Sequence, residues 1–139
     1  MTSTTLGELT AKHGFAVLEH LEAEAHVPVH SGLQAQGDLL IIPAGDTSGF
    51  SGSTRQVPPE GIAVIEAIGS GHEHRLFAGA LRTASFTPAF PGGADIGLLE
   101  CTEPAYLLHP EHGATGIAPG SYVLRRQREQ ADVERLVAD

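Results

Sequence analysis

The chain has 139 residues, of which 41% are hydrophobic and 18% charged, and its formal net charge at pH 7 is −9. That length suits one domain with a single core, and the hydrophobic content excludes a disordered chain. A strongly negative surface repels phosphate backbones and anionic membranes, so the charge argues against nucleic acid and membrane as partners.

The start of the chain carries no targeting pattern. Its first residues lack the basic leader and apolar core of a secretory signal, and no apolar run approaches the roughly 20 residues of a membrane span. Cys101 is the single cysteine, so the fold does not depend on an intramolecular disulfide. We therefore expect a cytoplasmic protein.

A short helix is predicted close to the N-terminus. Thr5 is followed three residues later by Glu8, the spacing of a capping box in which each side chain binds a backbone donor of the other. The helix should run from Leu6 to about Lys12 and stop at Gly14.

Residues 15–26, FAVLEHLEAEAH, allow two interpretations. Apolar residues at helical spacing, with many Glu and Ala, favour a second helix. The short apolar run FAVL also fits an extended strand, and both alternatives stay open. Pro28 ends the segment in either case.

The rest of the chain has the texture of many short strands joined by turns, with most of its 17 glycines and 9 prolines acting as punctuation. The pattern predicts a mainly β fold, a single small barrel or sandwich preceded by one or two short helices. We expect residues 1–30 to pack on a β domain of residues 31–128, with a tail at 129–139. The strand candidates are residues 39–42, 62–68, 72–81, 82–90, 96–102, 105–109 and 121–129.

Two histidine pairs stand at the ends of predicted strands. On a strand, His72 and His74 would point to one face about 6–7 Å apart, close enough to bind one metal ion. His109 and His112 flank a Pro-Glu turn whose spacing can aim both rings at one point. The alternative is that all four are turn or surface histidines that titrate near neutral pH without any catalysis.

If the pairs converge, all four histidines are candidate metal ligands. Four imidazoles would make a closed structural site, and three with a water molecule would make a catalytic one in which Glu111 serves as the base. Zinc is the first expectation, and iron, nickel and manganese stay open.

The HxH pair and the segment GDLLIIPAGDTS resemble the cupin family. The resemblance implies a double-stranded β-helix barrel that holds a divalent metal through histidines. Gly37, Pro43 and Gly45 match the second cupin motif, but Ser48 stands where its histidine is expected. The motif also precedes the HxH pair instead of following it, so no ligand set is carried over.

The series GDLLIIP, GHEH, LLHPEHG and PGSYVLRRQRE resembles short bacterial and phage-type proteins of unknown function, from Gly37 onward. That likeness implies one small all-β domain type and no particular activity.

Two functions follow from these patterns. The first is a small metal-binding β domain, whose metal either is structural or serves an enzyme that acts on a small molecule. The second is a non-enzymatic phage-derived or assembly module without a metal, whose strand edges meet a protein partner or another copy of the chain. Cys101 lies within a strand pattern and is expected to be a packed core thiol. Arg126 and Arg128 are expected to pair with nearby carboxylates.

Overall fold

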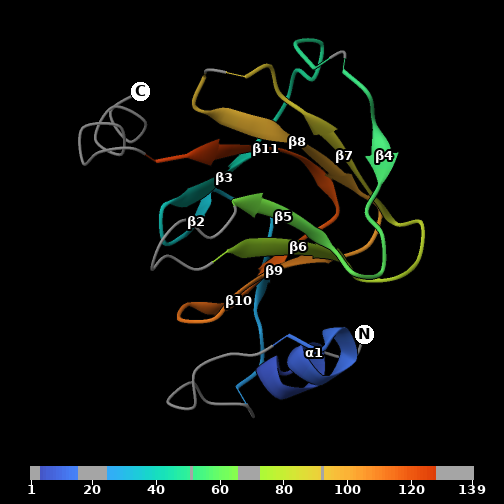
Figure 1. Cartoon of the computed structure of the whole chain (residues 1–139), viewed down its shortest axis with the longest axis vertical. Coiled ribbons are helices and arrows are strands. Elements are labelled where there is room, and N and C mark those ends of the chain that lie inside the picture. Colours follow the sequence, from blue (N-terminus) through green and yellow to red (C-terminus); the bar gives the residue numbers. More distant parts are fainter. Residues whose placement is uncertain (1–3, 16–24, 51, 66–72, 92, 128–139) are drawn as a thin grey trace.

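The computed structural model describes residues 4–15, 25–50, 52–65, 73–91 and 93–127. In this part of the chain the protein is mainly β, with one short helix, α1 (Leu6–His13), and two sheets (Figure 1). No helix among these residues is long and apolar enough to cross a membrane.

One sheet has five strands in the order β1-β10-β9-β6-β5, and the other has six in the order β2-β3-β11-β8-β7-β4. All pairs of neighbours are antiparallel except β1 and β10. The strands are β1 (Val29–His30), β2 (Gln34–Gln36), β3 (Leu39–Pro43), β4 (Arg55–Gln56), β5 (Ile62–Ile65), β6 (His74–Ala78), β7 (Ala84–Pro88), β8 (Asp95–Cys101), β9 (Ala105–His109), β10 (Gly113–Ile117) and β11 (Gly120–Arg126). In the described part of the chain the two sheets do not join into a closed barrel, so of the two predicted architectures the barrel is wrong and the arrangement is like a sandwich.

The main core lies between the two sheets. Side chains alternate along each strand, so every second residue points inward. In β6, for example, Leu76 belongs to this core whereas Phe77 points to the outer face. The fully buried members contributed by both sheets are Leu39, Ile41, Leu76, Leu99, Ala105, Leu107, Ile117, Tyr122 and Leu124.

A second, smaller core lies under α1, which covers the outer face of the five-stranded sheet (Figure 1). Leu6 and Leu9 of the helix pack there against Phe77 and Leu108. The predicted capping box is present, and the helix ends at a left-handed glycine. The predicted second helix falls mostly on residues 16–24, outside the described part of the chain.

The register of β6 and β9 determines where the histidines lie. Arg75 pairs with Leu108 in this antiparallel ladder, so the next position along joins His74 to His109. Both rings point to the inner face, in line with Leu76 and Leu107. The space between the sheets therefore ends in polar side chains at this edge.

Candidate functional site

Three of the four predicted ligand histidines gather at this end of the inter-sheet space. The ring centroid of His109 lies 4.4 Å from that of His74 and 4.5 Å from that of His112, and the two outer rings are 6.4 Å apart. His72 lies outside the described residues, and its role stays a prediction.

His74 is the most buried member, with 2% of the residue exposed. Its Nδ1 lies 2.9 Å from Oε1 of Gln36, and its Nε2 lies 3.0 Å from Oδ1 of Asp38. Burial lowers the pKa of His74, and the hydrogen bond and charge of Asp38 oppose that shift. The nearby charges of His112 and Arg126 lower it further.

The Gln36 side chain decides which nitrogen of His74 carries the proton. Its Nε2 donates to the backbone carbonyl of Leu107 at 2.8 Å and to Oγ1 of Thr115 at 3.0 Å. A carbonyl only accepts, so the NH₂ group must face Leu107 and the amide oxygen must face His74. Nδ1 of His74 therefore carries a proton.

His109 acts mainly as the acceptor of a hairpin turn. Its Nδ1 accepts hydrogen bonds from the backbone N–H groups of Glu111 at 3.0 Å and His112 at 3.2 Å. An accepting Nδ1 carries no proton, so a neutral His109 carries its proton on Nε2. Gly113 completes the turn with a φ of +77°. The HPEHG motif thus joins β9 to β10, and Glu111 is exposed in the turn.

His112 lies against the backbone of the β2–β3 turn. Gly37 adopts a φ of +58° there, which favours glycine. A Cβ at this position would lie 2.8 Å from Nε2 of His112 and 3.4 Å from Cε1 of His74. Gly37 therefore lets the two rings approach the turn that presents Asp38.

Gln36 and Asp38 were not predicted from the sequence. They lie 38 and 36 residues from His74 in the chain, and nothing in the GLQAQGD segment signals a partner so far away. Among the described residues, no group of three or more His, Cys, Asp or Glu is arranged to hold a metal ion as it stands. His74 and Asp38 lie side by side as a possible pair of ligands, with Nε2 3.0 Å from Oδ1.

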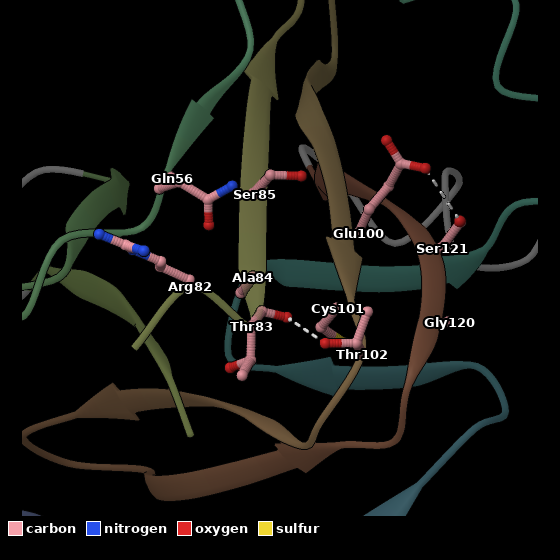
Figure 2. Close-up of a pocket in the computed structure, with 10 residues that line it drawn as sticks. All are labelled: Gln56, Arg82, Thr83, Ala84, Ser85, Glu100, Cys101, Thr102, Gly120 and Ser121. Carbon is pink, nitrogen blue, oxygen red and sulfur yellow. Dashed lines mark hydrogen bonds between the residues drawn. The ribbon is translucent and has the colours of Figure 1, made fainter. Parts of the chain in front are cut away.

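A separate pocket of about 400 Å³ lies at the other end of β11 and contains none of these histidines. Figure 2 shows Arg82 and Gln56 on one side of it and Glu100 with Ser121 on the other. Cys101 forms part of its lining, is buried, and donates to the carbonyl of Ala118 at 3.4 Å. Burial raises the pKa of this thiol, which fits the prediction of a packed core thiol rather than a nucleophile.

Comparison with known families matches residues 35–127 to the family model described as "Domain of unknown function (DUF8820)". The matched region holds every described site residue and leaves α1 outside. The searches of curated proteins and of solved structures found no match. The phage-type resemblance stays a prediction. Since the match covers about two thirds of its length, the chain belongs to this domain family of unknown function.

Proposed function

We propose that the protein binds one divalent cation between Nε2 of His74 and the carboxylate of Asp38, with His112 as a further ligand. Zinc is the first candidate, because it accepts imidazole and carboxylate ligands in a tetrahedral arrangement. The observation that carries the proposal is that each ring nitrogen of His74 faces an oxygen atom that accepts hydrogen bonds and donates none. These oxygens are Oε1 of Gln36 and Oδ1 of Asp38.

A neutral imidazole has a single N–H, and in His74 this N–H is at Nδ1, where it donates to Oε1 of Gln36. The lone pair of Nε2 then faces a carboxylate oxygen at 3.0 Å, an arrangement that needs a positive charge between the two atoms. That charge is either a second proton on the ring or a metal ion.

The distance between the two atoms is close to that of a metal-bound pair. Zinc ligands at 2.0–2.2 Å and a tetrahedral angle lie about 3.4 Å apart. Separating Nε2 of His74 and Oδ1 of Asp38 by a few tenths of an ångström is therefore sufficient. The Asp38 side chain is 58% exposed, so it is able to move outward by that amount.

Direct measurement of metal content tests the proposal. Untagged protein titrated with zinc, nickel, manganese and iron(II) by calorimetry should bind about one equivalent of at least one ion. His74→Gln and Asp38→Asn should each weaken that binding at least about tenfold, because each removes one ligand of the pair. Asp46→Asn is the matched control, since Asp46 is an exposed carboxylate beyond the far end of β3.

Two results would reject the site. One is wild-type protein that takes up no measurable divalent ion; the second proton on His74 would then be the charge that Asp38 faces. The other is equal binding by wild type and by His74→Gln. The sequence-based prediction of a metal-dependent enzyme with Glu111 as base rests on this binding and is tested only after it.

A further inference from the structure

We infer that Gln36 is a positioning residue that fixes His74 in the tautomer able to bind a cation through Nε2. This inference rests on the proposed cation site for its purpose, but the tautomer can be observed without any metal. Gln36 itself touches the ring at Nδ1, on the side away from Asp38.

The amide of Gln36 is held in one orientation. It is 2% exposed, and its NH₂ group is committed to the carbonyl of Leu107 and the hydroxyl of Thr115. Turning the amide over would place its oxygen against the carbonyl oxygen of Leu107, in a site that excludes water. The acceptor at Nδ1 of His74 is therefore permanent.

The other tautomer of His74 is disfavoured for the same reason. A proton on Nε2 would leave the lone pair of Nδ1 facing Oε1 of Gln36, which is buried and held in place, so this pair of acceptors stays unsatisfied. A proton on Nδ1 leaves the lone pair of Nε2 facing Asp38 instead, and that carboxylate, whose side chain is 58% exposed, is able to turn toward water when no cation is bound. A histidine that binds a metal through one ring nitrogen commonly donates the N–H of its other nitrogen to a fixed oxygen. That hydrogen bond orients the ring and makes the metal-binding nitrogen a better ligand.

The position of Gln36 in the fold makes this control rigid. The residue lies on β2, at the edge of the six-stranded sheet, yet its amide bonds to β9 and β10 of the other sheet. His74 lies on β6 beside β9. The Gln36 side chain thus connects the two sheets and fixes the tautomer of His74, whose ring faces Asp38.

Gln34 offers a matched control on the same strand. Its amide also crosses to the five-stranded sheet, where it donates to the carbonyl of Gly116 at 3.0 Å, and it also donates to the carbonyl of His30 at 3.3 Å. No hydrogen bond joins it to His74. Gln34→Met and Gln36→Met each remove sheet-bridging hydrogen bonds, but only the second removes the acceptor at Nδ1.

The experiment is nitrogen NMR of the histidine rings in metal-free, full-length protein, at a pH above the histidine titration range. We expect wild type and Gln34→Met to hold His74 with its proton on Nδ1. Gln36→Met should give a mixture of tautomers and bind zinc about 10–100-fold more weakly, as for the loss of other outer partners of metal ligands. Gln34→Met should bind zinc like wild type.

A wild-type His74 protonated on Nε2, or on both nitrogens at that pH, would overturn the inference. So would a Gln36→Met variant that keeps both the tautomer and the zinc affinity. If Gln36→Met does not fold, the wild-type spectrum still decides. If wild type has the Nδ1 proton but binds no metal, the cation site is rejected and the tautomer assignment for Gln36 stands.

Discussion

At the scale of single residues, two buried histidines that touch each other have different roles. His74 donates from Nδ1, so Nε2 is its available nitrogen, whereas His109 accepts at Nδ1 and carries its proton on Nε2. The first arrangement suits a ligand through Nε2, and the second does not. Sequence spacing treats them alike, because it does not show what each ring nitrogen meets.

His109→Asn tests this division. The side-chain oxygen of asparagine occupies the position of Nδ1 and is a good acceptor for turn N–H groups, so the hairpin should keep its stability to within about 1 kcal/mol. His109→Leu removes the acceptor and should cost about 1–3 kcal/mol. Urea unfolding measures both values.

Zinc titration of the same two variants completes the test. We expect His109→Asn to bind zinc like wild type, because the ring is not a ligand in the arrangement we propose. A loss of zinc affinity in His109→Asn as large as that in His74→Gln would show that His109 is a ligand. Its Nδ1 would then give up the hydrogen bonds of the turn when zinc binds.

At the scale of elements, α1 is held by its caps, by the packing of Leu6 and Leu9 and by contacts from its last turn. The ring of His13 stacks on Phe77 of β6, with centroids 4.0 Å apart. Its Nε2 is buried and has no hydrogen-bond partner in the described part of the chain. Burial lowers the pKa of His13, and the charge of Lys12 lowers it further. The packed helix therefore favours the neutral ring.

This arrangement predicts a loss of stability in acid. The folded pKa of His13 lies below its ordinary value of 6.5, so the unfolded chain binds the proton more readily. The neutral ring contributes its full stability at pH values above 6.5, the ordinary pKa. This contribution is lost as the pH falls from 6.5 toward the lower pKa of the folded protein. His13→Phe keeps the stacking and cannot be protonated, so its unfolding free energy should fall less with pH than that of wild type.

Urea unfolding of both proteins at several pH values on either side of 6.5 measures the difference. Comparing slopes isolates His13, because the other histidines contribute equally to both proteins. Identical slopes would mean that His13 is not protonated differently in the folded and unfolded chains.

Elements were predictable where apolar residues mark them. The predicted strands at 39–42, 96–102 and 105–109 lie within one residue of β3, β8 and β9. The strand β10, GATGI, was not predicted, because its glycines are weak strand formers. Gly116 is needed there because a Cβ would collide with the carbonyl of Pro28, beside the parallel strand β1. That reason exists only in the folded protein.

At the scale of the whole molecule, the proposed cation would connect the two sheets. His74 belongs to the five-stranded sheet, and Asp38 belongs to the turn between β2 and β3 of the six-stranded one. The backbone N–H of Gln127, just after β11, donates a hydrogen bond to the backbone carbonyl of Asp38 at 2.7 Å. A ligand that binds only the folded chain stabilises it by an amount that grows with the logarithm of the ligand concentration divided by the dissociation constant.

Zinc at about 100 times its dissociation constant should therefore raise the unfolding free energy by about 2.7 kcal/mol. The gain should disappear on chelation and be strongly reduced in Asp38→Asn, where a neutral amide replaces the charged ligand. Calorimetric melting with and without zinc measures it. An equal gain in wild type and Asp38→Asn would place the cation elsewhere on the molecule.

The sequence by itself determined the mainly β class, the capped helix and most strands, because capping, turn residues and apolar alternation act over a few neighbouring residues. Only the tertiary structure decided that the two sheets of the described residues stay open and that Gln36 and Asp38 reach the two ring nitrogens of His74. These features depend on strand order and register, which bring together residues more than 30 positions apart. A spacing pattern carries no information about such pairs.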